Sequence, residues 1–176
     1  MNLKKQKKQR IGIQRLSGMQ DYTAENCQRV RIAVETLSTH LTKKGYTNID
    51  TPIIEETDLF VRKSGGELIS RLYSFTEPGG HNVSLRPEFT SSAIRHFIEE
   101  RDSLTIPVRW QYNGPVFRYA PTENGGYRQF TQIGAELVGA AGMEADTEII
   151  GLALEGLEKI GVGKIQVRIG HLGVMH

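Results

Sequence analysis

The amino-acid sequence predicts an α+β fold, in which helices pack against antiparallel strands. Two long segments, 23–45 and 145–160, carry apolar residues at the three- and four-residue spacing of a helix. Residues 72–86 have the pattern of a β-hairpin, two strand-forming segments joined by a glycine-rich turn. Helical segments mixed with antiparallel strands are typical of the α+β class.

The composition is that of a soluble globular domain. The chain has 176 residues, of which 38% are hydrophobic and 24% charged, which is enough for one domain with its own core. A net charge of +2 argues against a strong field for nucleic acid or membrane over the whole chain. The single cysteine excludes an internal disulfide, and no apolar run approaches the roughly 20 residues of a membrane span. We therefore expect a cytoplasmic protein with no membrane partner.

The first 15 residues differ from the rest of the chain. They begin "MNLKKQKKQR", which is strongly basic, and no apolar segment follows to complete a signal peptide. Residues 1–15 are expected to form a flexible, solvated tail, with an arm that touches RNA as the alternative. Residues 16–176 are expected to form the folded module.

The segment 23–45 is expected to be a long amphipathic helix. Thr23 suits the N-cap, and Gly45 suits the position just after the helix. The apolar face carries residues at steps of three and four: Cys27, Val30, Val34, Leu37 and Leu41. Cys27 lies on this face, so we expect it to be an unreactive core residue.

The next segment, "YTNIDTPIIE" at 46–55, is expected to be a strand with Pro52 inside it. Proline cannot donate to a neighbouring strand, so this strand should lie at an edge of its sheet or be interrupted at Pro52. An edge strand after a long helix suits a subunit contact. The alternative is an ordinary edge that proline protects from further pairing.

The middle of the chain is expected to form a hairpin and a helix. Strands at 72–76 and 82–86 flank the turn "EPGG". A helix should begin near Pro87, because proline suits the first helical turn. Its inward residues are expected to be Ala93, Ile94, Phe97 and Ile98.

The second half of the chain is expected to continue with strands and one helix. A strand at 108–118 leads through a loop to a second strand within 125–139. The helix at 145–160 carries one apolar face, made of Ala145, Ile149, Leu152, Ala153, Leu157 and Ile160. The segment "KIQVRIG", 164–170, is expected to be a last short strand.

The strand in "GGYRQFTQIGAELVG", 125–139, has two different faces, because successive strand side chains point in opposite directions. The first face is suited to a core and carries Thr131, Ile133, Ala135 and Leu137. The second face carries Arg128, Phe130, Gln132, Gly134 and Glu136. Gly134 is expected to leave a gap over which a flat polar ligand could lie. The alternative is an antiparallel strand with one solvated face.

Polar residues from three segments form a candidate amino-acid site. Glu88 and Thr90 could hold an α-ammonium, and the Arg118 fork could hold a carboxylate or a phosphate. Gln132 and Glu136 could accept from a ring N–H or bind a cationic ring. The set suits a free amino acid with a polar side chain, and perhaps its activated ester. Taken singly, Glu88 could instead complement a helix dipole, and the arginines could form weak surface ion pairs.

Several motifs together resemble the histidyl-tRNA synthetase family of class II synthetases, from about Leu16 to Met175. They are "SGMQDYTAEN", "GYTNIDTPIIEETDLFVRKSGGELISRLYSFTEPGG", "LRPEFT", "GPVFRY" and "GYRQFTQIGAELVG". The resemblance implies the N-terminal part of a class II core, an antiparallel sheet flanked by helices. It also implies a homodimer built by motif 1, around Pro52. Motif 2 would correspond to 108–138.

The resemblance assigns roles to individual residues. Histidine would be bound by Glu88, Thr90, Arg118, Gln132 and Glu136. Arg118 would be the catalytic residue that contacts the histidine carboxylate and the α-phosphate of ATP, and Arg128 would add a further nucleotide contact. An active synthetase would use ATP and Mg²⁺ and would have tRNA(His) as its partner.

Two positions depart from the family pattern. Motif 2 of active synthetases usually reads Phe-Arg-x-Glu, and Ala120 stands where that glutamate would read adenine. Gly126 stands where an arginine commonly faces the ATP phosphates. These losses should weaken electrostatic stabilisation of the transition state. The pattern therefore resembles the family's paralogue, the regulatory subunit of ATP phosphoribosyltransferase, which would bind histidine, need no cofactor and pair with the catalytic subunit.

The alternative is an active histidine–tRNA ligase. The third class II motif, with its catalytic arginine, and any anticodon-binding domain would lie beyond residue 176, so this chain alone is not expected to charge tRNA. A metal-dependent or nucleophile enzyme is a third class, for which no H-E-x-x-H or Walker pattern exists. The five histidines lack metal-ligand spacing and are expected at the surface or at helix caps: His40, His81, His96, His171 and His176.

Overall fold

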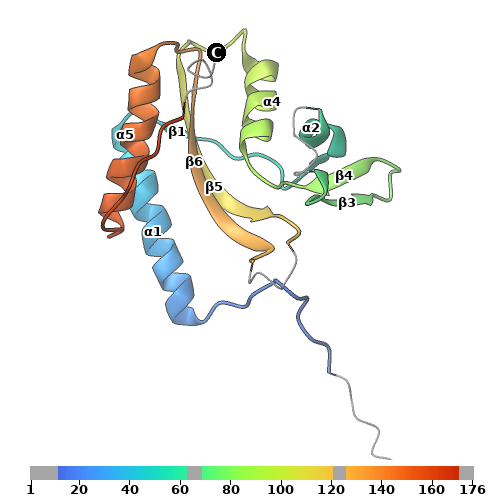
Figure 1. Cartoon of the computed structure of the whole chain (residues 1–176). Helices are drawn as coiled ribbons and strands as arrows, with labels where there is room; N and C mark the ends of the chain where they lie inside the picture. The colour runs from blue at the N-terminus through green and yellow to red at the C-terminus, as the bar shows by residue number, and fades with distance from the viewer. Residues whose placement is uncertain (1–11, 63–68, 121–125, 171–176) are drawn as a thin grey trace, which may run out of the picture.

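The computed structural model describes residues 12–62, 69–120 and 126–170, and these form two three-stranded sheets with helices around them (Figure 1). The elements are α1 (Ala24–Lys43), β1 (Thr47–Asn48), β2 (Ile54–Glu56), α2 (Thr57–Val61), β3 (Tyr73–Thr76), β4 (Asn82–Leu85), α4 (Thr90–Glu100), β5 (Val108–Phe117), β6 (Gln129–Val138) and α5 (Met143–Lys159). The α+β class is confirmed. The basic segment 1–11 lies outside the described residues.

The larger sheet has the order β1-β5-β6 and is dominated by a long hairpin. Strands β5 and β6 pair antiparallel, from Val108 opposite Val138 to Phe117 opposite Gln129, and β1 runs parallel to β5. Helices α1 and α5 cover one face of this sheet, and α4 lies on the other side (Figure 1). The smaller sheet, β2-β4-β3, is antiparallel.

Each face of the larger sheet has its own apolar cluster. On the side of α1 and α5, Ile133 and Ala135 of β6 pack against a cluster of Leu41, Tyr46 and Leu152. The prediction that Ile133 and Ala135 face a core is therefore confirmed. The opposite face is also packed, since Phe130 contacts a second cluster of Phe89, Ala93, Tyr112 and Val116.

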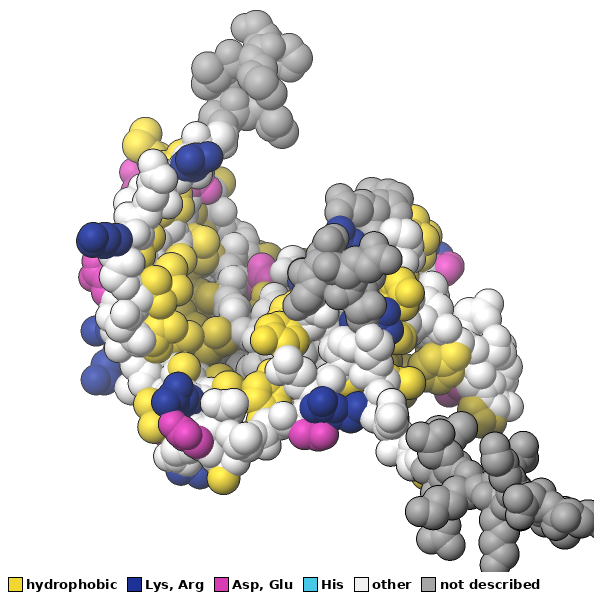
Figure 2. All heavy atoms as spheres, turned by 60° about the horizontal axis from the view of Figure 1, so that its bottom comes forward, with side chains coloured by type: hydrophobic (Ala, Val, Ile, Leu, Met, Phe, Trp, Pro, Cys, Tyr) yellow, Lys and Arg dark blue, Asp and Glu magenta, His cyan; other side chains and the backbone are white. Residues whose placement is uncertain are grey.

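Helix α1 begins and ends as predicted, but its N-terminal half is not buried. The Thr23 hydroxyl accepts from the Asn26 N–H at 3.2 Å, and Gly45 has a φ of +88° after the helix. Cys27 is exposed, so its prediction as a core residue is wrong. The reason is that no other described element covers this end of α1. One face of the molecule is hollowed, and apolar side chains gather in the hollow (Figure 2).

Two histidines also differ from their predicted surface positions. His40 is only 4% exposed, because it lies against α5, where the Glu155 carboxylate is 3.6 Å from its Nε2. His96 is half-buried and stacks on Trp110, with ring centroids 5.1 Å apart.

The segment around Pro52 is interrupted, as the proline predicted. Strand β1 ends at Asn48 and β2 begins at Ile54, and each joins a different sheet. The predicted hairpin is confirmed as β3 and β4, with Tyr73 opposite Leu85 and Thr76 opposite Asn82. Gly80 has a φ of +89° in the turn between them.

Three predicted details are wrong. Helix α4 begins at Thr90 rather than near Pro87. The reason is that the Glu88 carboxylate accepts the Ser91 N–H, and so stabilises a first helical turn that starts after Glu88. Ile98 is 61% exposed, because it lies on the outer side of α4. Residues 164–170 form no strand, since no described strand pairs with them.

A polar network connects Tyr46, the residue before β1, with β5 and α5 at the end of the larger sheet. The Tyr46 hydroxyl donates to Glu148 at 2.8 Å, and Arg109 donates to both oxygens of the same carboxylate at 2.8 and 2.9 Å. These hydrogen bonds, from Arg109 first and then Tyr46, lower the pKa of Glu148 to about 2. Burial is the main reason that the pKa of Tyr46 is raised.

The Glu148→Gln variant tests this network. The folded-state pKa of Glu148 lies below its unfolded value of about 4.3. Its contribution to stability is therefore present above that value and is lost as the pH falls toward about 2. We expect the variant to have a free energy of unfolding about 1 kcal/mol lower at pH 7. The effect is this small because solvent screens the partly exposed pair of Arg109 and Glu148. Its stability should also fall less between pH 5 and pH 2.5.

Urea unfolding across this pH range checks both expectations. Glu158→Gln, at an exposed position of the same helix, is the control. Equal pH dependence in the wild-type protein and Glu148→Gln would contradict the assignment.

Among the described residues, every helix is too short or too polar to cross a membrane.

Candidate functional site

The candidate site lies where the start of α4 meets the β5–β6 hairpin. Thr90 is the first residue of α4, and Tyr112 and Glu136 come from the two strands. The Tyr112 hydroxyl is 2.8 Å from Glu136 Oε1 and 3.5 Å from the Thr90 hydroxyl. The structure therefore connects Thr90 to Glu136 through Tyr112, a residue that the sequence analysis missed.

The predicted gap over Gly134 is filled by Tyr112. The two residues are directly opposite in the hairpin, and a Cβ atom added to Gly134 would lie 2.5 to 2.7 Å from Tyr112 ring atoms and the hydroxyl. The prediction that Gly134 leaves an empty gap is wrong, because Tyr112 of the neighbouring strand already fills it. A tyrosine opposite a glycine was the only available signal, and it required the pairing register.

Tyr112 is the last of three side chains that stack in a column. Its ring is almost parallel to that of Phe89, with centroids 4.5 Å apart and planes inclined by 9°. The guanidinium carbon of Arg86 lies 3.9 Å from the centroid of the Phe89 ring. We call Arg86, Phe89 and Tyr112 the stacked column.

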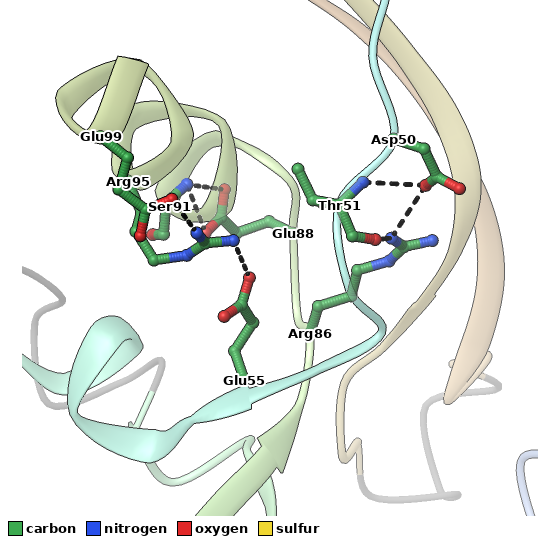
Figure 3. A network of polar contacts seen from close by, with 8 residues as sticks. All are labelled: Asp50, Thr51, Glu55, Arg86, Glu88, Ser91, Arg95 and Glu99. Carbon is green, nitrogen blue, oxygen red and sulfur yellow. Dashed lines mark hydrogen bonds and ion pairs between the residues drawn. The ribbon is translucent and has the colours of Figure 1, made fainter. Parts of the chain in front are cut away.

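Arg86 anchors this column in the interior. It is 2% exposed, and it donates to the carbonyls of Thr51 at 2.7 Å and Pro115 at 3.0 Å. Figure 3 shows its guanidinium directed at Asp50 and Thr51, with Asp50 Oδ1 3.8 Å away. Burial lowers the pKa of Arg86, and the Asp50 charge acts in the opposite direction.

Glu88 serves as a helix cap in this structure. Both of its carboxylate oxygens accept from the Ser91 N–H, at 3.1 and 3.2 Å (Figure 3). Further along α4, Arg95 bridges Glu55 of β2 and Glu99, with both contacts at 2.7 Å. These contacts fix the start of α4 beside the site.

Hydrogen-bond acceptors remain open in the site. The Gln132 Oε1 atom is buried and has no hydrogen-bond partner among the described residues. Tyr112 donates to Oε1 of Glu136, and Oε2 has no hydrogen-bond partner among the described residues. A buried acceptor without a donor is costly, so Gln132 suits a ligand that donates.

The burial of Tyr112 is the main reason that its pKa is raised, and the charges of Glu136 and Glu88 act in the same direction. Its hydroxyl therefore keeps its proton at neutral pH and remains a donor to Glu136.

Two arginines lie at the end of the same hairpin. Arg118 donates to the Pro87 carbonyl at 2.7 Å and lies over the Phe130 ring, which places it next to the segment that carries Glu88. Arg128 donates to the Ala120 carbonyl at 2.9 Å and lies 4.2 Å from the Tyr119 ring centroid. Arg118 is thus near the start of α4, whereas the Arg128 side chain contacts Tyr119 and Ala120, which follow β5.

The two positions that depart from the synthetase pattern lie against each other. A Cβ atom added to Gly126 would lie 3.1 Å from the Ala120 Cβ. Neither position carries a charged or hydrogen-bonding side chain.

The Gly134→Ala variant tests the contact with Tyr112. We expect it to lower the free energy of unfolding by about 1–3 kcal/mol, because the new methyl group must displace the tyrosine ring. Gly151→Ala is the matched control. Gly151 lies within α5 with no atom near the added methyl, so this change should stabilise by about 0.5–1 kcal/mol. Urea unfolding measures both, and two changes of the same sign would contradict the prediction.

Comparisons with known proteins identify the family to which the chain is similar. A family model described as "Histidyl-tRNA synthetase" matches residues 18–176. The histidine–tRNA ligase of Methanospirillum hungatei is 39% identical over 163 residues, and that of Pyrococcus horikoshii is 37% identical over 158 residues. These alignments cover 93% and 90% of this chain but only 40% and 37% of the relatives, so the chain spans less than half of their length.

Solved structures show the same fold. A Bacillus halodurans protein named as an ATP phosphoribosyltransferase regulatory subunit/histidyl-tRNA synthetase has a TM-score of 0.83 at 25% identity. That match covers 94% of this chain and 42% of the other. Apo histidyl-tRNA synthetase of S. aureus has a TM-score of 0.72 at 33% identity, over 86% of this chain and 40% of the other.

Proposed function

Because the chain belongs to the histidyl-tRNA synthetase family, we propose that its site binds histidine in a regulatory subunit of ATP phosphoribosyltransferase. The observation that carries histidine binding is the set of open acceptors on the inner face of the β5–β6 hairpin. Gln132 offers a buried oxygen without a donor, and Glu136 offers its second carboxylate oxygen. Histidine supplies the matching donors in its ammonium group and its ring N–H.

Each part of the amino acid has a partner of suitable chemistry. Glu88 and Thr90 at the start of α4 would hold the α-ammonium. Gln132 and Glu136 would hold the imidazole ring. The terminal nitrogens of Arg118 would pair with the carboxylate, because the Nε atom is already used by the Pro87 carbonyl.

The regulatory role is supported by the two positions at which the family pattern expects contacts to ATP. Ala120 and Gly126 pack together and offer neither an acceptor for adenine nor a charge for phosphate. Arg128 is engaged by the Ala120 carbonyl and the Tyr119 ring. Such a protein would regulate a catalytic partner subunit by binding histidine with different affinity in two states of the complex, since coupling requires that difference.

Active histidine–tRNA ligase is the second candidate, and it is favoured by the names of the curated relatives at 37–39% identity. The full-length protein would then join the histidine carboxylate to the α-phosphate of ATP, release pyrophosphate and pass histidine to tRNA(His). Arg118 would stabilise the charge on the reacting groups, and Mg²⁺ would neutralise phosphate charge.

We also propose that the full-length protein is a homodimer through the region of Pro52. Ile53 and Ile54, next to this proline, are 44% and 47% exposed, and Val30 and Ile32 on α1 are 36% and 52% exposed. Exposed apolar side chains on an edge strand and a helix suit a partner surface of the same chain.

Two measurements on the full-length gene product test these functions: histidine binding by calorimetry, and histidine-dependent exchange between ATP and pyrophosphate. The regulatory proposal expects binding without exchange. Exchange at rates typical of synthetases would establish the ligase instead. Absence of histidine binding would contradict both.

The double variant Ala120→Glu, Gly126→Arg gives a matched comparison. The regulatory proposal attributes weak ATP binding to the missing nucleotide contacts. This variant should therefore gain measurable ATP binding, while its affinity for histidine stays within about twofold of the wild-type value.

A further inference from the structure

We propose that Tyr112 is a positioning residue, which orients Glu136 toward the ring donor of the ligand and is itself held by the stacked column. This inference rests on the proposed histidine-binding function. It assigns the discrimination between rings with and without an N–H donor to a buried tyrosine on the neighbouring strand.

The position of the Tyr112 ring is restricted on two sides. Phe89 lies against its face, and the Gly134 backbone lies against its Cε2–Cζ edge. Arg86 lies on the other face of Phe89 and is fixed by two carbonyls, so the column has little freedom to shift. Tyr112 as a whole is 3% exposed. Tyr112 therefore presents its hydroxyl at one place between Thr90 and Glu136.

The hydrogen bonds of this hydroxyl have a defined direction. A phenol has one proton, and an ionised carboxylate only accepts, so Tyr112 donates to Glu136 at 2.8 Å. At the longer contact of 3.5 Å the Tyr112 oxygen is then the acceptor, and Thr90 is the donor. The raised pKa of Tyr112 keeps this direction unchanged at neutral pH.

This direction determines what the site offers to a ligand. Oε1 of Glu136 is occupied, so a ligand donor meets Oε2, and the Thr90 oxygen keeps its lone pairs for the ammonium group. A carboxylate held at one oxygen also loses less rotamer freedom when it binds a ring N–H. Removal of the Tyr112 hydroxyl should therefore weaken the binding of ligands whose ring donates a hydrogen bond, and should leave the binding of other ligands unchanged.

The test compares two ligands on the Tyr112→Phe variant of the full-length protein. Calorimetry is carried out with L-histidine and with β-(2-thienyl)alanine, whose ring has no N–H. The expected result is a 3- to 10-fold rise in Kd for histidine, which corresponds to about 1 kcal/mol for a lost hydrogen bond, and no change for thienylalanine. Tyr22→Phe, at an exposed tyrosine, is the control and should leave both values unchanged.

A purely structural role would weaken both ligands equally, and that result would overturn the proposal, as would unchanged histidine affinity. In a Glu136→Gln background the effect of Tyr112→Phe should become smaller, because the two residues act through one contact. Equal effects in both backgrounds would also overturn it.

A measurement without ligand separates this proposal from the function itself. The carboxyl ¹³C resonance of Glu136 should move in Tyr112→Phe, since its donor is lost, and should stay in place in Tyr22→Phe. A wild-type protein that fails to bind histidine would refute the proposed function. An unmoved Glu136 resonance would refute the positioning role.

Discussion

Arg86→Ala is expected to lower the free energy of unfolding by about 3–5 kcal/mol, the largest stability effect of any substitution considered for this protein. The variant leaves the buried carbonyls of Thr51 and Pro115 without their donor, and each such group costs about 1–3 kcal/mol. It also leaves a cavity beside Phe89. Since domains are stable by only about 5–15 kcal/mol, this loss is a large share of the total stability.

Urea unfolding followed by circular dichroism measures this loss. Arg29→Ala is the matched control, because Arg29 is exposed and, among the described residues, its polar contact is a helical ion pair with Glu25. That change should cost less than about 0.5 kcal/mol. Arg86→Lys should fall between the two, since an ammonium keeps the charge but loses the planar fork. Arg86→Ala within 1 kcal/mol of the control would contradict the role of Arg86 as an anchor.

Glu136→Gln is expected to reduce the affinity of the full-length protein for histidine by about 10- to 100-fold. The change keeps the shape of the side chain and removes its charge, and a hydrogen bond to a charged group contributes about 1.5–3 kcal/mol. Calorimetry with L-histidine measures the effect. Glu158→Gln, on the exposed surface of α5, is the control and should bind histidine as the wild-type protein does.

A change of less than threefold in Glu136→Gln would place the imidazole elsewhere. Unfolding by urea in the absence of ligand shows whether the variant keeps its fold, so that a loss of affinity is not a loss of structure. This control matters because Glu136 accepts from the buried Tyr112 hydroxyl.

Local features of the chain were predictable because local physics decides them. The Thr23 cap, the glycine after α1 and the break at Pro52 each follow from the preferences of one or two residues. The β3–β4 hairpin was predictable from its turn. The alternation along β6 correctly placed Ile133 and Ala135 against a core.

Other predictions failed because they depended on neighbours from distant parts of the chain. Cys27 lies on an apolar helix face, but no described element covers it. His40 is buried because α5 packs beside it. Residues 164–170 have strand-forming side chains, but a strand also needs a partner, and none of the described strands pairs with them.

The candidate site shows the same division. The sequence by itself determined which polar residues were proposed for the site, because Glu88, Thr90, Arg118, Gln132 and Glu136 stand in motifs that resemble those of a known family. Only the tertiary structure decided how they are connected. The register of β5 against β6 sets Tyr112 over Gly134, and the packing of α4 brings Phe89 and Thr90 to the same ring. Register and packing arise from contacts across the whole fold, so no local stretch of sequence could reveal that a tyrosine fills the expected gap.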